Sequence, residues 1–537
     1  MGIPSYFSHL IKNNPSILKK LIELKTIPDN LYFDSNSIIY DCLRKIEKEN
    51  LHLKDSVLET KLINDVCKTL DNYILTISPK KVVYIAFDGV APFAKMDQQK
   101  NRRYKSALDK DIRIGLGLSV NNVWDKTAIT PGTNFMEKLS KKLNNYYKTK
   151  TSKLGVNKII ISDSSSEGEG EHKIFNYIRR NPQKHKNETT LIYGLDADLI
   201  MLCLNHIPLT PKIYLYRETP EFIKSINRSL DPGSSYLMDI PQLATTIINK
   251  MNNYKKINKK QQKNRLYDYI FLCFFLGNDF LPHFPAVNIR TSGIDTLIVA
   301  YQNTIGKGNQ NLTNGKKIFW NNVKKMIDYI SKTEELLLKQ EYKIRERLEK
   351  KKILIKNEAD KLYNFSLLPT RNRTKEKMIN PYEENWKYRY YKVLFDIDIN
   401  DSNRKKICVN YLEGLEWTLN YYSDGCLDWK WTYKFNYPPL MSDLIKYIPN
   451  WDTTFIKKNN NTSVHPYVQL SYVLSKPSLK LLPNNIQKKL LEKYPEYYKM
   501  DKRICWAFCK YFWESHVKFD HININDLETF VTGLING

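Results

Sequence analysis

The first 300 residues of the chain alternate short apolar runs with longer amphipathic segments. The apolar runs are rich in β-branched residues and predict five strands: Asn30–Phe33, Val82–Phe87, Lys158–Ser162, Leu191–Gly194 and Lys212–Tyr216. Apolar residues at helical spacing predict four helices between the strands: Ile38–Ile46, Asp55–Leu75, Asn134–Thr149 and Glu171–Arg179. This alternation indicates an α/β fold with a mostly parallel central sheet flanked by helices, whose ligands bind beyond the C-terminal strand ends.

The second half of the chain has a different pattern. Glu and Lys dominate from Ser331 to Ala359, and apolar residues recur there near heptad spacing, which predicts one long exposed helix. This helix is interpreted as a solvated connector, with a coiled-coil partner surface as the alternative. Residues 364–380 are predicted to be a linker, and Trp386–Phe395 opens a mostly helical, aromatic-rich region. We therefore expect an α/β core over 1–330, a charged helix and linker over 331–380, and a second region over 381–537.

Carboxylates follow four of the predicted strands closely, and a further one ends a buried apolar run. These acids are Asp34, Asp88, Glu169, Glu171, Asp196, Asp198 and Asp279. Asp196 and Asp198 are expected to share one face of a strand because strand side chains alternate. Each acid alone could be a turn former or a helix N-cap, and Asp163, Glu167 and Asp268 are interpreted as supporting residues.

Seven carboxylates at one sheet edge would repel one another unless cations occupied the site. Carboxylate oxygens without Cys or His ligands suit Mg²⁺ or Mn²⁺. Two such ions about 3.5–4 Å apart can clamp a phosphodiester for in-line attack by water. The acids therefore predict a two-metal phosphodiester hydrolase.

A basic segment follows Asp88 directly. If the residues after Pro92 are helical, Lys95, Gln99, Arg102 and Arg103 share one helix face. Arginine forks bind phosphate oxygens bidentately and lysine adds a point charge, so this face predicts a pocket for a terminal phosphate. The alternative is an ordinary solvated helix face.

Charge and composition narrow the class of protein. Lys and Arg number 84 against 57 Asp and Glu, a net charge of +27, which favours nucleic acid as the partner. A hydrophobic content of 42% excludes a disordered chain. The eight cysteines lack paired spacing, and the chain shows no leader, which favours a reducing compartment, cytoplasmic rather than nuclear. No apolar run approaches membrane length, so we expect no membrane association. We expect a monomer and leave protein partners open.

Many stretches of the chain resemble the Xrn family of 5′→3′ exoribonucleases, in that family's order. They are MGIPSYF, LYFDSNSIIYDC, AFDGVAPFAKMDQQKNRRY, ITPGTNFM, SSEGEGEHK, YGLDADLIML, DYIFLCFFLGNDFLPHFP, WKYRYYKVLF, YLEGLEWTLNYYSDGCLDWKWTYKFNYPP and PYVQLSYVLSKPSLKLLP. The resemblance covers both conserved regions of the family's catalytic portion. It implies a PIN/FEN-like nuclease core, with a helical second region wrapping the active site. It also implies a processive, metal-dependent exoribonuclease that prefers single-stranded RNA with a 5′-monophosphate.

The resemblance also assigns roles to residues. The seven acids match the family's metal ligands, and Lys95, Gln99, Arg102 and Arg103 match its 5′-phosphate pocket. Tyr40 stands where the family usually has a base-stacking His, and its ring can also stack. The Trp partner for that stack is expected to be Trp431 or Trp429. Asp97 and Lys100 replace Asn and Arg, which would weaken the local positive charge, and the family's long C-terminal extensions are absent.

Two other functions remain open at this point. A flap-type DNA nuclease shares the metal-carboxylate chemistry, although no Gly-hairpin-helix motif for binding DNA follows the last acid. A non-catalytic RNA-binding scaffold is expected to lack one or more of the metal-binding acids. All seven are present, which argues against it. His172 and His283 are interpreted as satisfied structural histidines. A zinc site at Cys505, Cys509, His516 and His521 is disfavoured because its central gap is too short.

Overall fold

The structure is a computed structural model that describes residues 2–23, 27–49, 53–118, 124–218 and 234–537, with residues 224, 228 and 230 besides. Its main sheet has the order β1-β7-β6-β5-β2-β3-β4. The strands are β1 (Leu18–Lys20), β2 (Asn30–Asp34), β3 (Val82–Ala86), β4 (Lys158–Ser162), β5 (Thr190–Tyr193), β6 (Ile213–Glu218) and β7 (Ser235–Asp239). Strands β2 to β6 are parallel, and β7 and β1 add antiparallel at one edge. The five predicted strands and the mostly parallel sheet are confirmed, whereas β1 and β7 were not predicted.

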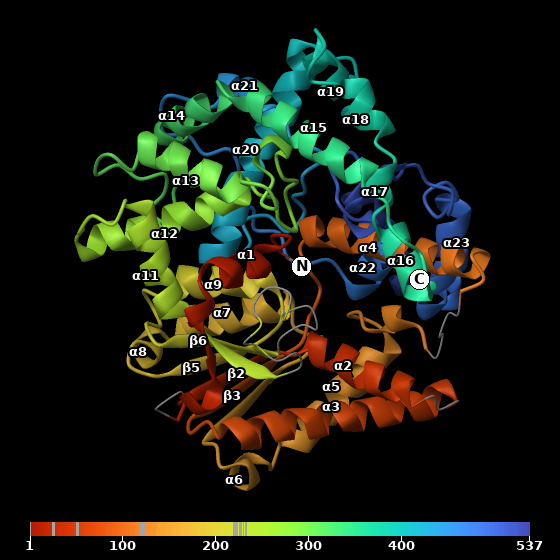
Figure 1. The fold of residues 1–537 in the computed structure, drawn as a ribbon. Coiled ribbons are helices and arrows are strands. Elements are labelled where there is room, and N and C mark those ends of the chain that lie inside the picture. Colours follow the sequence, from red (N-terminus) through yellow and green to blue (C-terminus); the bar gives the residue numbers. More distant parts are fainter. Residues whose placement is uncertain are drawn as a thin grey trace.

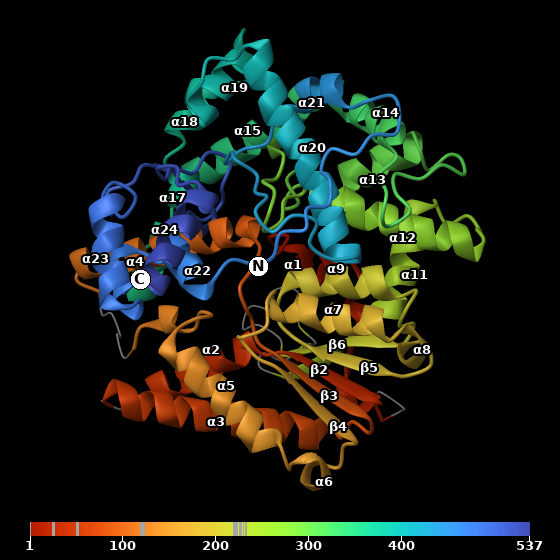
Figure 2. The same cartoon turned by 180° about the vertical axis from the view of Figure 1, so that it is seen from behind.

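Helices cover both faces of this sheet (Figures 1 and 2). They are α1 (Tyr6–Asn13), α2 (Asn36–Lys48), α3 (Asp55–Ile77), α5 (Asn134–Tyr147), α6 (Thr151–Leu154), α7 (Gly170–Arg180), α8 (Pro182–His185), α9 (Ala197–His206) and α11 (Ile240–Met251). Side chains alternate along β2, so Leu31 and Phe33 pack with α2, α3 and α5, whereas Tyr32 joins the core under α1, α7 and α9. The four predicted helices are confirmed as α2, α3, α5 and α7.

The rest of the chain is mainly helical and lies beyond one end of the sheet, at the top of Figure 1. Its helices are α12 (Lys259–Phe274), α13 (Gly293–Asn303), α14 (Trp320–Ser331), α15 (Glu334–Lys350), α16 (Glu358–Ser366), α17 (Leu368–Arg371), α18 (Thr374–Ile379), α19 (Trp386–Phe395), α20 (Asp401–Ser423), α21 (Met441–Tyr447), α22 (Pro466–Val473), α23 (Asn484–Lys493) and α24 (Ile524–Asn536). A short antiparallel pair, β8 (Ile504–Cys505) and β9 (His516–Val517), lies before α24. One continuous core joins Ile200 of α9, Leu272 of α12 and Leu415 of α20, so the two parts share apolar packing.

Residues 331–380 differ from the prediction of one exposed helix followed by a linker. Helix α15 ends at Lys350, and α17 and α18 lie back beside it. Arg345 donates to both carboxylate oxygens of Glu376, and Arg373 donates to the same carboxylate, with all three side chains buried. The helix is confirmed over Glu334–Lys350, but its full exposure and the linker are wrong, because these charged residues neutralise one another inside the protein instead of facing water. The boundaries at residues 330 and 380 remain a prediction.

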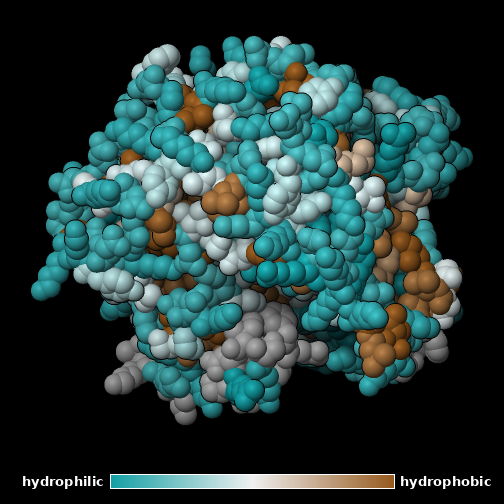
Figure 3. All heavy atoms as spheres, turned by 45° about the horizontal axis from the view of Figure 1, so that its top comes forward, coloured by the Kyte–Doolittle hydropathy of each residue, from teal (hydrophilic) through white to brown (hydrophobic). Residues whose placement is uncertain are grey.

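The surface is predominantly hydrophilic on the face that Figure 3 shows, with separate hydrophobic patches. Among the described residues, none of the helices combines the length and the apolar character that crossing a membrane would require.

Candidate active site

The parallel strands bring most of the predicted acids to one edge of the sheet. Asp34 ends β2, Asp88 follows β3, and the loop after β4 delivers Glu169 and Glu171 to the start of α7. Asp279 comes from the turn after α12. Since these strands run in one direction, the residues that follow them meet at their common C-terminal edge.

The Asp-x-Asp sequence does not lie on a strand, so that part of the prediction is wrong. Strand β5 ends at Tyr193, Asp196 is the residue before α9, and Asp198 lies in the first helical turn. Carboxylates are favoured at this helix end because the helix dipole and the free N–H groups stabilise negative charge. Asp196 is exposed and Asp198 is buried, so one acid faces the open side of the cluster and the other faces its floor.

The carboxylate oxygens converge closely enough to hold a cation. Single oxygens of Asp34, Glu171 and Asp196 lie within 4.8 Å of one another. Asp88 is fixed beside them, because its carboxylate accepts the Gly170 N–H at 2.7 Å and the Asn36 amide at 2.5 Å. The structure therefore places these predicted acids together.

Two glycines allow this close packing. A Cβ atom on Gly170 would lie 2.7 Å from Oδ1 of Asp34. A Cβ on Gly2 would collide with the carboxylate of Asp198, and Gly2 also has a φ of +54°, a conformation that side chains disfavour. The Gly2 N–H donates to Asp279 at 3.1 Å. The close spacing of the site thus depends on residues without side chains.

Lys95 lies among the acids. It is on α4 (Phe93–Gly115), and its ammonium forms ion pairs with Glu169 and, at 2.7 Å, with Asp279. The sequence predicted Lys95 in the phosphate pocket, whereas here its charge is directed toward the carboxylates. It bridges the cationic face of α4 and the acidic edge of the sheet.

Burial and mutual repulsion dominate the electrostatics of the cluster. Burial, followed by Asp88, raises the pKa of Asp34 well above its ordinary value. Burial and Glu169 raise the pKa of Glu171 in the same way, and burial and Asp279 raise the pKa of Asp198 to about 7. Burial also opposes ionisation of Asp279, but Lys95 and the other nearby positive charges together outweigh it and lower that pKa. One lysine does not neutralise seven acids, so the site favours additional cations.

The second part of the chain contributes residues that were not predicted. Tyr421 and Tyr422 on α20 donate hydrogen bonds to Glu169 at 2.9 Å and to Asp198 at 3.0 Å. Burial raises the pKa of both phenols, so both are donors. The adjacent pair in LNYYSDG could have indicated this role only together with the fold, since α20 is over 200 residues from either acid.

His172 also belongs to the site. Its ring stacks on Tyr421 at 3.7 Å, and its Nε2 is 3.8 Å from Glu171. Neither ring nitrogen has a hydrogen-bond partner within the described part of the chain, so the expectation of a satisfied histidine is wrong. Glu169, Glu171 and His172 form a second group whose ligand atoms lie within 4.8 Å. Burial lowers the pKa of His172, so the ring is neutral.

The other predicted phosphate-binding residues line the same side of α4. Arg103 donates to Thr130 at 2.7 Å, while its Nη1 and the Oε1 of Gln99 are buried without a hydrogen-bond partner in the described residues. Burial and the neighbouring Arg102 lower the pKa of Arg103 to about 10, which leaves it charged at neutral pH. Arg102 itself is exposed. An arginine nitrogen without a partner is suited to an anion.

The stacking residues need one correction. Tyr40 on α2 is half-buried, and it is close enough to Arg103 to influence that residue's pKa. Trp431 is only 8% exposed and stacks on Trp417 at 5.3 Å in the core, so it is poorly placed for a base. Trp429 is half-buried, and its carbonyl accepts the Phe93 N–H at the start of α4. Of the two candidates, the structure favours Trp429.

The two departures from the family pattern pair with each other. Lys100 lies 2.9 Å from Asp97, and both contact the Tyr472 hydroxyl. Lys100 is buried, and its ammonium also lies 4.4 Å from the centre of the Tyr472 ring. Asp97 and Lys100 therefore neutralise each other and lie against the C-terminal aromatic residues.

A mostly parallel sheet that gathers carboxylates at one edge, completed by a helical second part, is the fold class of PIN-like nucleases. Residues 1–219 match the profile of the XRN 5′-3′ exonuclease N-terminus, and residues 259–378 and 368–527 match that of the Xrn1 helical domain. The chain belongs to the XRN family of 5′-3′ exonucleases.

Curated relatives match along almost the whole chain. The chain is 26% identical to a Drosophila melanogaster protein named 5′-3′ exoribonuclease 2 homolog, over 94% of this chain and 69% of that protein. It is 29% identical to 5′-3′ exoribonuclease 1 of Saccharomyces cerevisiae, over 90% of this chain and 40% of that protein. The human protein of that name is also 29% identical, but this chain covers 32% of its length.

Proposed function

We propose that the chain is a 5′→3′ exoribonuclease. It would hydrolyse single-stranded RNA that carries a 5′-monophosphate and release mononucleotides. The names of the relatives support exoribonuclease activity. The observation that carries the proposal is the convergence of carboxylates from four strand ends and a turn beside a cationic helix.

The acids fit two hard divalent cations, Mg²⁺ or Mn²⁺. Asp34, Glu171 and Asp196 would hold one ion, and Glu169, Glu171 and His172 supply a second group of donors. Such ions neutralise phosphate oxygens and activate water when bound. Lys95 would stabilise the carboxylates nearest to it, and Tyr421 and Tyr422 would orient two of them.

The cationic face of α4 would set the direction of cleavage. Gln99, Arg102 and Arg103 would bind the 5′-phosphate, and Tyr40 would stack on the first bases. A pocket of this kind admits one phosphate and excludes a cap or a triphosphate by size. The chain is proposed to act as a monomer, and its cytoplasmic location remains a prediction from composition.

The decisive experiment compares four RNAs of one sequence that bear 5′-monophosphate, 5′-hydroxyl, 5′-triphosphate or cap. With Mg²⁺ we expect rapid release of mononucleotides only from the monophosphate RNA, and no release with EDTA. Arg103→Ala should slow decay of that RNA but change the 5′-hydroxyl RNA little. Equal slowing of both would mean that α4 binds the backbone in general.

Asp198→Ala tests catalysis against binding alone. The change removes a carboxylate but no predicted phosphate contact, so cleavage should stop while RNA binding remains. Matching DNA substrates test the flap-nuclease alternative. Wild-type protein that binds RNA without cleaving it would favour the scaffold.

A further inference from the structure

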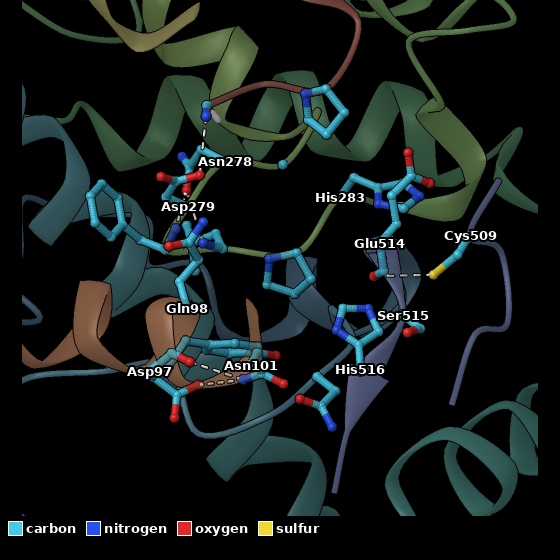
Figure 4. A pocket seen from close by; sticks show the side chains of 18 of the residues that line it. Asp97, Gln98, Asn101, Asn278, Asp279, His283, Cys509, Glu514, Ser515 and His516 are labelled. Atoms are coloured by element: carbon cyan, nitrogen blue, oxygen red, sulfur yellow. Dashed lines mark hydrogen bonds between the residues drawn. The ribbon is translucent and has the colours of Figure 1, made fainter. Parts of the chain in front are cut away.

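A cavity lies on the side of α4 that faces residues 509–516. It encloses about 210 Å³ and is lined by α4, by the turn that carries Asp279, and by residues around β9 (Figure 4). Asp279 and Arg102 line it, whereas Tyr40, Gln99 and Arg103 are not among its walls. The cavity therefore adjoins the acid cluster beside the predicted phosphate pocket and shares Arg102 with it.

The inner end of the cavity carries unused hydrogen-bonding atoms. Figure 4 places Gln98, Asn278 and Asp279 together at this end. The Oε1 of Gln98 and the Nδ2 of Asn278 are buried and lack a hydrogen-bond partner among the described residues. Buried amide atoms are normally satisfied, so an acceptor and a donor without partners beside one cavity indicate a place for a polar ligand.

The outer end of the cavity is aromatic, and Arg290, which forms an ion pair with Glu514, lies beside the rings. Trp513 lines it, is 45% exposed and stacks parallel to Tyr511 at 5.8 Å. Arg290 lies over the Tyr511 ring at 5.6 Å. Aromatic rings beside arginine are typical of surfaces that bind nucleobases without sequence preference.

We propose that this cavity is a nucleotide-binding site that receives the nucleoside 5′-monophosphate after cleavage. Arg102 would pass the phosphate from the reaction site, the amides of Gln98 and Asn278 would pair with polar groups of the nucleotide, and the base would lie toward Trp513. The remaining RNA would occupy the side of Tyr40 and Arg103, so the product would need a second way out. This inference rests on the proposed exonuclease function.

Photolabelling with 8-azidoadenosine 5′-monophosphate, in EDTA and on the full chain, tests the site. Peptide mapping should find label in the segment that holds Trp513. Trp513→Ala should lower that labelling on the order of tenfold, the range expected for one lost base–aromatic stack. Trp451→Ala is the matched control, since Trp451 is 68% exposed and is not a wall of the cavity. Gln98→Leu, checked for an unchanged melting temperature, should also weaken labelling.

Arg103→Ala separates this site from the phosphate pocket. Labelling near Trp513 should persist in this variant and would then stand even if RNA cleavage were not found. Label that is confined to α2 and α4 and is lost with Arg103→Ala would overturn the proposal, as would labelling unaffected by Trp513→Ala. A 5′-hydroxyl RNA with 8-azidoadenine at its third nucleotide tests whether the cavity holds the RNA strand instead of the released mononucleotide. Label near Trp513 from this RNA, without label from the free monophosphate, would assign the cavity to the RNA strand and overturn the proposal.

Discussion

The ammonium of Lys95 lies 2.7 Å from the carboxylate of Asp279, although α4 and the turn after α12 are far apart in the sequence. Both side chains are almost fully buried. The same ammonium also pairs with Glu169. Lys95 is therefore the built-in counter-charge of the acidic edge, and removing it leaves two carboxylates to repel their neighbours.

Lys95→Met should destabilise the metal-free protein and increase its response to Mg²⁺. Breaking a buried ion pair costs on the order of 3–5 kcal/mol, because the remaining charge is uncompensated. Divalent cations would restore part of that loss. Thermal unfolding with EDTA and with Mg²⁺ measures both effects, and exposed Lys141→Met provides the control. If the two variants respond alike, Lys95 is not the counter-charge of the cluster.

Tyr421→Phe should weaken metal binding without unfolding the protein. The change removes one hydrogen bond to Glu169 and keeps the ring that stacks on His172. Loss of an outer partner of a metal ligand typically costs 10–100-fold in affinity or activity, so the Mg²⁺ concentration for half-maximal cleavage should rise on the order of tenfold.

Tyr411→Phe is the matched control for that experiment. It lies on the same helix, and its hydroxyl donates to the carbonyl of Pro282 instead of to an acid. An identical Mg²⁺ titration for Tyr421→Phe and wild type would refute the positioning role of Tyr421.

His206 makes stability depend on pH. It is 1% exposed, its Nδ1–H donates to the Leu202 carbonyl, and its Nε2 accepts from Arg179 at 3.0 Å. Burial and the Arg179 charge lower its pKa to about 3, so the folded protein keeps the ring neutral. An unfolded chain protonates the same ring near pH 6.5.

The contribution of neutral His206 to the free energy of unfolding should therefore be complete above about pH 6.5 and be lost as pH falls toward 3. Each unit of pH in that window costs up to about 1.4 kcal/mol, because only the unfolded state takes up the proton. Denaturant unfolding at several pH values should show a shallower acid slope for His206→Gln, despite lower stability at pH 7. An unchanged slope would show that other groups carry the acid sensitivity.

The sequence was sufficient for the elements whose pattern is local. The strand before Asp34 and the helix after Pro92 follow from alternation and helical spacing. The acids could be collected in advance because parallel strands share one C-terminal edge. Asp198 was assigned to a strand because a short apolar run does not distinguish strand from helix.

Contacts between distant segments could not be predicted. The sequence predicted Arg345 and Glu376 to be exposed charges, because no local pattern shows that they pair inside the protein. Tyr422 reaches Asp198 only because α20 packs on α9. Trp431 and Trp429 could not be separated from the sequence, whereas packing on Trp417 buries the ring of Trp431.

Tyr40 and Trp429 form the last pair to test, as the candidate base-stacking residues. Tyr40 lies near Arg103, and the Trp429 carbonyl accepts from Phe93 at the start of α4, so both flank the helix proposed to hold the 5′-phosphate. Trp431, by contrast, belongs to the core. Substitutions at Tyr40 and Trp429 should thus lower the cleavage rate, whereas substitution of Trp431 should lower the free energy of unfolding.

Tyr40→Ala and Trp429→Ala should each lower the rate on single-stranded RNA on the order of ten- to a hundredfold, since one base–aromatic stack is worth about 1–3 kcal/mol. Tyr40→Phe should keep most activity because it preserves the ring. Trp431→Ala should instead lower the free energy of unfolding by about 3–5 kcal/mol, as expected for a buried Trp. Cleavage rates and denaturant curves on all four variants separate the two roles. A loss of stability in Tyr40→Ala that matches its loss of activity would make Tyr40 a core residue of α2 and remove it from the substrate site.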